Sequence, residues 1–210
     1  MSAVAASTRR PVAAHVATSV PVALLFVLFA ISNFAQWRAT HRPIGLGATA
    51  LELLVATLFV VRRSPWLVSR SPLAWAAAAV GTFGMLTARP AYAPVGGLEP
   101  LYVALQLGGA LFAGAALLSL GRSFGLVAAN RGVRTSGPYR LVRHPVYSGY
   151  VITWTAYLLE NPSLWNGCIL LAVTAIQAIR ILEEERTLAE DPAYRAYCSR
   201  VKSRVIPRLL

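Results

Sequence analysis

The chain has 210 residues, of which 56% are hydrophobic and only 13% are charged, and its mean hydropathy is +0.56. This composition excludes an ordinary soluble domain and predicts an integral membrane protein. The formal net charge is +12. We expect topology and anionic lipid to account for this charge, so nucleic acid is not indicated as a partner.

The apolar segments predict an all-α fold, a bundle of about six transmembrane helices. A helix rises about 1.5 Å per residue, so about 20 apolar residues cross a hydrocarbon core of about 30 Å. We divide the chain into a flexible N-terminus (1–17), four N-terminal spans (18–120) and a C-terminal core (121–210). The fifth apolar segment is short for a span. The six segments are 18–37, 44–61, 72–87, 101–120, 146–159 and 163–181.

The distribution of basic residues predicts the orientation of this bundle. With six crossings, all of the 20 arginine and lysine residues except Arg38, Arg42 and Arg89 fall on one side. Positive residues accumulate on the cytoplasmic side, so both termini are expected in the cytoplasm. We expect the protein to lie in a plasma membrane of prokaryotic type.

The first four spans offer little chemistry. Glu52 is their only intramembrane carboxylate, and such a group is by default a candidate functional residue. We place it near the start of the second span, which favours a neutral or interface-paired residue. Small residues in the third span, including Gly81 and Gly84, predict close helix packing.

The last two apolar segments predict a helical hairpin followed by a tail helix. Asn161-Pro162 is the expected turn and helix start. Asp191-Pro192 caps and starts the amphipathic tail, which we expect to lie at the membrane interface. Two roles stay open for this tail, an anchor on anionic lipid and a lid over a cofactor.

Chemistry is expected in two motifs, GPYRLVRHPVYSG (137–149) and RILEEER (180–186). Pro145 biases His144 away from helical backbone angles, so its ring and its carbonyl can both face a ligand. Tyr147 offers a flat face and Gly149 a gap for close approach. We therefore expect a pocket at this membrane entry.

The second motif predicts an acidic wall for that pocket. Arg180 and Glu184 are four residues apart and share a helical face, whereas Glu185 points elsewhere. Three adjacent carboxylates repel one another, and a cationic ligand would relieve that repulsion. No metal site is predicted.

Together these motifs resemble the isoprenylcysteine carboxyl methyltransferase family and the related phospholipid methyltransferases. The resemblance runs from about residue 120 to the C-terminus and includes LGRSFG and the tail DPAYRAYCSRVKSRVIP. It implies a membrane enzyme that uses S-adenosylmethionine. The segment AEDPAY and the six spans depart from the eukaryotic prenylcysteine enzymes, so we expect another lipidic or hydrophobic acceptor.

The resemblance also implies roles for individual residues. Arg180 would lie near the methyl-accepting group, and Glu184 and His144 complete the expected catalytic set, with His144 or a glutamate as base for an amine, thiol or hydroxyl acceptor. A carboxylate acceptor would need no base. The implied cofactor-binding residues are Tyr139, Arg143, His144, Pro145, Tyr147, Gly149, Glu184 and Glu185.

The predicted function is methyl transfer from S-adenosylmethionine to a lipidic or hydrophobic acceptor that enters from the bilayer. Membrane lipids are expected partners, and no protein partner is indicated. Two alternatives stay open. One is an NADPH-dependent membrane reductase with a layout like that of the sterol reductases, and the other is a non-catalytic lipid-binding membrane protein.

Overall fold

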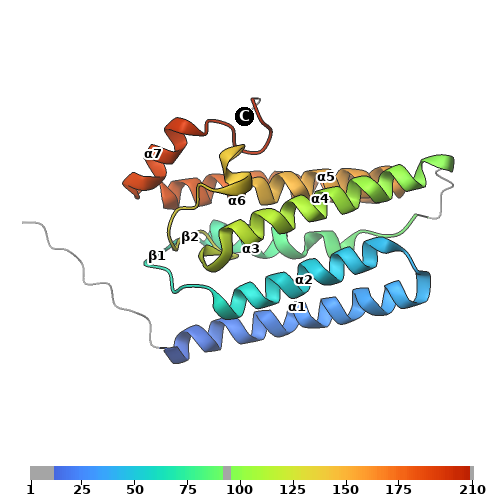
Figure 1. Ribbon diagram of the computed structural model, residues 1–210, viewed down its shortest axis with the longest axis horizontal. Helices are drawn as coiled ribbons and strands as arrows, with labels where there is room; N and C mark the ends of the chain where they lie inside the picture. The colour runs from blue at the N-terminus through green and yellow to red at the C-terminus, as the bar shows by residue number, and fades with distance from the viewer. Residues whose placement is uncertain (1–11, 92–95, 209–210) are drawn as a thin grey trace, which may run out of the picture.

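The structure is a computed structural model that describes residues 12–91 and 96–208, with side chains described from Ser19 onward. Its long helices run side by side, and a two-stranded ribbon and the tail helix lie together at one end of the bundle (Figure 1). The predicted all-α fold is confirmed, because the ribbon of two residues per strand is the only strand structure in these ranges.

Helices α1 (Val12–Thr40) and α2 (Pro43–Val61) form an antiparallel hairpin. Pro43 occupies the first turn of α2, where its missing N–H leaves no hydrogen bond unmade. Gly45 permits a close crossing, since a Cβ there would lie 2.9 Å from Cβ of Trp37. Helix α1 already begins at Val12, so residues 12–17 of the expected flexible N-terminus are helical; residues 1–11 lie outside the described ranges.

Helix α3 (Pro72–Phe83) packs against α6 (Leu164–Leu188) through small residues, as predicted. A Cβ at Gly81 would lie 2.9 Å from Oε1 of Gln177, and one at Gly84 would lie 2.6 Å from a methyl group of Val173. The amide of Gln177 donates to the carbonyl of Gly81 at 2.7 Å. After Phe83 the chain tightens into the 3-10 turn η1 (Gly84–Thr87).

Helices α4 (Glu99–Leu120) and α5 (Pro145–Glu160) cross at two glycines. A Cβ at Gly149 would lie 2.6 Å from the carbonyl oxygen of Gly109, so only hydrogen fits between the two backbones. The short 3-10 turn η2 (Gly96–Leu98) leads into α4.

The connections at one end of the bundle pair with each other. Strand β1 (Leu67–Val68) is antiparallel to β2 (Ala129–Asn130), which joins the loop after α2 to the loop after α4. The turns η3 (Gly121–Ser123) and η4 (Gly137–Arg140) flank β2 in the sequence. Asn130 then donates to Asp191 at 2.9 Å, which ties the ribbon to the start of α7 (Pro192–Arg200).

Two predicted boundaries differ from the structure. Within the described residues, four helices are long and apolar enough to cross a membrane, not six. Helix α3 with η1 is shorter, and α5 has 16 residues, about 24 Å of helix. The turn after α5 also differs, because α6 begins at Leu164, with Ser163 rather than Pro162 at its start; the Ser163 hydroxyl accepts from the N–H of Asn166.

An ionic cluster around the buried Glu160 joins the helices at the end opposite the ribbon. Glu160, at the end of α5, accepts hydrogen bonds from Arg42 and from the Gln106 amide. Arg42 also pairs with Glu99 at 3.1 Å. A buried carboxylate needs such partners to remain charged. This cluster therefore holds the helices together at one end of the bundle. The polar loops lie at the other end.

Candidate active site

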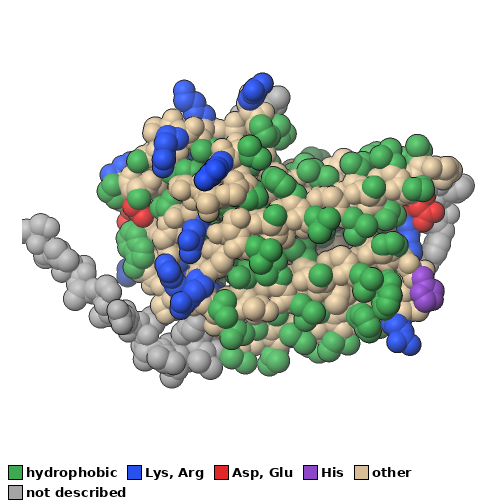
Figure 2. All heavy atoms as spheres, viewed as in Figure 1, with side chains coloured by type: hydrophobic (Ala, Val, Ile, Leu, Met, Phe, Trp, Pro, Cys, Tyr) green, Lys and Arg blue, Asp and Glu red, His purple; other side chains and the backbone are tan. Residues whose placement is uncertain are grey.

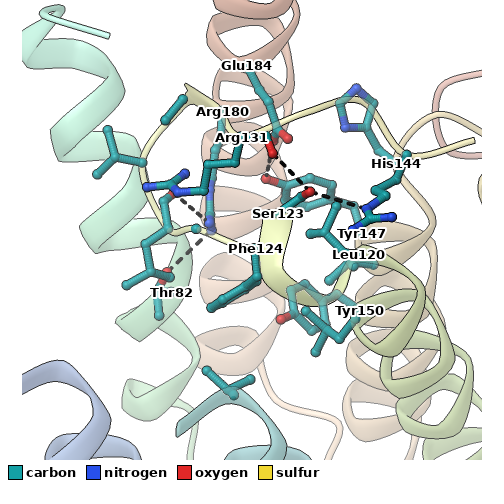
Figure 3. Close-up of a pocket in the computed structure, with 18 of the residues that line it drawn as sticks. Thr82, Leu120, Ser123, Phe124, Arg131, His144, Tyr147, Tyr150, Arg180 and Glu184 are labelled. Atoms are coloured by element: carbon teal, nitrogen blue, oxygen red, sulfur yellow. Dashed lines mark hydrogen bonds between the residues drawn. The ribbon is translucent and has the colours of Figure 1, made fainter. Parts of the chain in front are cut away.

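A cavity of about 260 Å³ lies at the ribbon end and extends inward between the helices. Its size is near the lower end of the range for ligand pockets, roughly 300–1,000 Å³. Polar groups from the loops and from α6 surround its outer part (Figure 3). Apolar residues from α1, α2, α4 and the turn η1 surround its inner part: Phe26, Leu51, Val55, Met85 and Leu117.

The ring of His144 borders this cavity at the start of α5. Its carbonyl is engaged elsewhere, because it accepts the N–H groups of Tyr147 at 3.1 Å and Ser148 at 3.3 Å and so begins the helix. The His144 N–H donates to the carbonyl of Arg204 in the tail, at 2.8 Å. His144 therefore borders the cavity, while its carbonyl is used to begin the helix.

Glu184 lies on the α6 face that borders the cavity, as the spacing predicted. Among the described residues its carboxylate accepts one hydrogen bond, from the Tyr147 hydroxyl at 3.3 Å. A carboxylate can accept about four. Glu184 therefore keeps most of its acceptor capacity directed into the cavity, beside the aromatic face of Tyr147 (Figure 3).

Arg180 lies one turn before Glu184 and also borders the cavity. Its guanidinium donates to the carbonyl of Leu126 at 2.8 Å and to the hydroxyl of Thr82 at 3.3 Å. It also stands 5.6 Å from the ring centre of Tyr147. None of these partners is anionic, so the positive charge is positioned but not neutralised.

Glu185 points away from the cavity and binds the loop and the tail. Its Oε1 lies 3.2 Å from Nε2 of His144 and forms an ion pair with Arg143 at 3.2 Å, and its Oε2 accepts a hydrogen bond from Arg204 at 3.0 Å. These contacts engage both of its oxygens. The structure thus places Glu185 as a support behind the His144 ring, and not on the cavity wall where the family resemblance put it.

Arg131, which the sequence analysis did not single out, enters the cavity from the loop after β2. Its guanidinium lies over the bare backbone of Gly125, where a Cβ would approach within 2.2 Å. Burial, and then the nearby charge of Arg62, lower the pKa of Arg131 to about 10. The neighbouring Arg134 donates to Ser123 at 3.2 Å. An anion in the cavity would stabilise the charged form of Arg131.

Three tyrosines line the side of the cavity nearest the tail. Tyr139, Tyr194 and Tyr197 are all buried and form one hydrophobic cluster with Ala116. The Tyr197 hydroxyl donates to the carbonyl of Tyr139 at 2.7 Å. The Tyr194 hydroxyl is buried and has no hydrogen-bond partner among the described residues. Burial raises the pKa of Tyr139 and Tyr194 and keeps both hydroxyls protonated.

The tail after α7 continues across the entry loop. The Ser203 carbonyl accepts from the N–H of Arg143 at 2.9 Å, and the Val205 carbonyl accepts from the Ser148 hydroxyl at 2.6 Å. With the inward tyrosines, these bonds place the tail over the cavity. The position of the tail therefore agrees with the lid alternative. The outward face of the tail carries exposed basic side chains (Figure 2).

The structure separates the predicted site residues into two groups. Those on the cavity wall are Tyr139, Arg143, His144, Tyr147, Arg180 and Glu184. Pro145 and Gly149 are buried in helix packing and do not border the cavity, so the gap expected at Gly149 is filled by α4.

The cavity also has lining residues outside the two motifs or not predicted from them. They include Thr82, Phe124, Arg131, Tyr150 and Trp154. Tyr150 and Trp154 carried a usable signal, because they follow Tyr147 at helical spacing and their rings stack with centres 5.0 Å apart. Thr82 and Arg131 reach the cavity only through contacts between distant segments.

Comparison with known proteins yields one family. Residues 101–194 match the model of the phospholipid methyltransferases. A search of curated proteins gives no match. The matched segment contains the cavity-lining parts of α4, α5 and α6 and ends at Tyr194. It confirms the resemblance predicted from the two motifs and, with the long apolar helices, indicates an integral membrane protein with methyltransferase activity.

Proposed function

From this phospholipid methyltransferase segment, we propose that the protein transfers a methyl group from S-adenosylmethionine to a hydrophobic acceptor that enters the cavity from the membrane. The proposal combines the family match over residues 101–194 with the cavity that these residues surround. The basic end of the bundle would face the cytoplasm, where a water-soluble donor is available.

One observation supports S-adenosylmethionine as the methyl donor. The unpartnered hydroxyl of buried Tyr194 and the mostly free carboxylate of Glu184 border the same cavity as several tyrosine rings. S-adenosylmethionine has an ammonium, ribose hydroxyls, a carboxylate and an adenine ring. Carboxylate, tyrosine and arginine side chains complement these groups. The residues present therefore fit this donor.

The expected roles follow from the positions of the side chains. Glu184 would hold a cationic or hydroxyl group, and the tyrosines would cover the flat base. Arg131 and Arg134 would attract the carboxylate. The His144 ring would close the wall, held from behind by Glu185. When bound, S-adenosylmethionine supplies a methyl group activated by a positively charged sulfur.

The protein then contributes positioning more than covalent chemistry. The buried aromatic wall excludes water, and a reacting pair held at about 3 to 3.5 Å gains most of its rate from proximity. Arg180 would steady an electron-rich acceptor near the cavity, since its charge has no anionic partner within residues 19–91 and 96–208. For an acceptor that must lose a proton, Glu184 and His144 are the available bases.

Calorimetric titration of the detergent-purified protein with S-adenosylmethionine tests this proposal. We expect measurable binding, and Glu184→Gln should weaken it at least about tenfold, or about 1.4 kcal/mol. Glu190→Gln is the matched control, because Glu190 is exposed and outside the cavity. Unchanged affinity in Glu184→Gln would refute the site. Stabilisation by NADPH with none by S-adenosylmethionine would refute the donor.

Activity requires a second assay, because the acceptor is unidentified. The protein is incubated with methyl-labelled S-adenosylmethionine and a lipid extract of the host membrane, and the labelled product is separated by polarity. Transfer of label into the organic phase supports a hydrophobic acceptor. Binding of the donor without any transfer would instead favour the lipid-binding alternative.

A further inference from the structure

Glu52 lies deeper in the membrane than the sequence suggested. It is at the midpoint of α2, a helix of 19 residues, and so stands about 13 Å from either end at about 1.5 Å per residue. It also borders the inner part of the cavity. Of the two roles favoured from the sequence, a neutral residue and an interface-paired one, the interface-paired role does not fit, since Glu52 is far from the helix start.

The contacts of Glu52 leave its carboxylate incompletely bonded. The side-chain nitrogen of Asn33 lies 3.0 Å from each of its two oxygens and also donates to the carbonyl of Phe29. Among the described residues no basic side chain pairs with Glu52. A carboxylate held by one amide keeps free acceptor sites, and here the cavity is where they can be filled.

The surroundings of Glu52 are otherwise apolar. Phe26, Leu51, Val55 and Leu117 border the same inner region, and Met85 extends it towards α3. A hydrophobic ligand body fits these walls, and a single hydrogen-bond donor on it would find one partner there. An unpaired donor or acceptor in such a region is costly, so each polar group selects for the other.

We propose that Glu52 and Asn33 form a specificity site for the methyl acceptor, binding a hydrogen-bond-donating group on a compact hydrophobic molecule. That the bound molecule is the methyl acceptor rests on the proposed function. That a molecule binds here rests on the contacts of Glu52 and Asn33 alone. A phospholipid is disfavoured as the occupant, because its charged head would have to leave the interface for a position about 13 Å deep.

The assignment gives the two parts of the chain separate tasks. The segment that matches the family, 101–194, supplies the polar outer cavity. Asn33 and Glu52 lie outside that segment, on α1 and α2. The N-terminal helices thus set which acceptor is bound, while the C-terminal core binds the donor.

Photo-crosslinking with matched probes tests the site. The probes are a compact hydrophobic alcohol carrying a diazirine and its methyl ether, which is larger by one carbon and cannot donate a hydrogen bond. We expect the alcohol to label cavity residues of α1 and α2 about tenfold more than the ether does, as a hydrogen bond to a charged group allows. Equal labelling by both probes in the unaltered protein would overturn the proposal.

Two variants complete the experiment. Glu52→Leu removes the acceptor and should abolish the preference for the alcohol, whereas Glu99→Leu removes an exposed carboxylate outside the cavity and should preserve it. A preference that persists in Glu52→Leu would also overturn the proposal. Calorimetry with S-adenosylmethionine runs in parallel, and Glu52→Leu should bind it normally. If even the unaltered protein fails to bind the donor, the proposed function fails while the labelling still decides the site.

Discussion

The Nε2 atom of His144 lies 3.2 Å from Oε1 of Glu185, and this contact joins the two sequence motifs from behind the cavity. The other oxygen of Glu185 accepts a hydrogen bond from Arg204 in the tail, at 3.0 Å. One carboxylate therefore links the entry loop, the end of α6 and the tail. The order of the site depends on this link, although Glu185 does not border the cavity.

Glu185→Ala is expected to release the tail from the loop. It leaves the buried His144 ring and the Arg143 guanidinium without their anionic partner, so the free energy of unfolding should fall by about 3 kcal/mol. Denaturant unfolding in mixed micelles measures this change, and trypsin should cleave faster between Arg200 and Arg204. Glu190→Gln, on an exposed side chain, should alter neither. Full stability in Glu185→Ala would contradict the linking role.

Tyr194→Phe is expected to separate folding from binding. The Tyr194 hydroxyl has no hydrogen-bond partner in the part of the chain that the structure describes, so its removal should leave the free protein equally stable or more stable by about 1 kcal/mol. If the hydroxyl binds the donor, affinity for S-adenosylmethionine should fall by about tenfold. Thermal unfolding and calorimetry measure the two effects. Unchanged affinity would remove Tyr194 from the binding site.

The buried Tyr197 is expected to make the folded protein less stable in alkali. Burial raises the pKa of Tyr197 to about 12 from its ordinary value of 10.0. Between these values the folded protein keeps a proton that the unfolded chain has lost, so the free energy of unfolding falls as pH rises from 10 to 12. Below pH 10 this contribution is fully present.

Tyr197→Phe should flatten that pH dependence. It also removes the hydrogen bond to the Tyr139 carbonyl, so stability at neutral pH should fall by about 1 kcal/mol. Denaturant unfolding at several pH values gives the slope. An identical slope in Tyr197→Phe would show that other buried tyrosines, such as Tyr139, carry the effect.

Gly149→Ala is expected to strain the crossing of α4 and α5. The added Cβ would lie 2.6 Å from the Gly109 carbonyl and 2.7 Å from the Ala113 side chain, so the helices must separate, at a cost of about 1 to 3 kcal/mol. Gly108→Ala is the matched control, because nothing lies within 4 Å of a Cβ there. It should be neutral or stabilising by up to about 1 kcal/mol. Equal stability of the two variants would contradict the packing role.

Much of the fold follows from local pattern. Apolar length predicts the long helices, and Asp191-Pro192 predicts the start of α7, where the Asp191 carboxylate accepts from the N–H of Ala193 at 2.8 Å. Small residues predict the close contact of α3 with α6. All six predicted segments are helical, but the third, α3 with η1, is shorter than a full span, and its last turn packs against α6.

Part of the site follows from helical geometry. Residues four apart on a helix share a face, so Arg180 and Glu184 reach the cavity together while Glu185 faces the tail. The resemblance to a methyltransferase family and the match over residues 101–194 depend on local motifs, which a sequence carries directly.

The sequence by itself determined the membrane class, the family segment and the side chains of the entry loop, because each depends on neighbouring residues. Only the tertiary structure decided that Glu52 and Arg131 share one cavity with Glu184, that Gly149 packs against a helix, and that Glu185 supports the tail. These relations join segments far apart in the chain. They are set by close packing and by the pairing of buried polar groups, which a linear pattern does not encode.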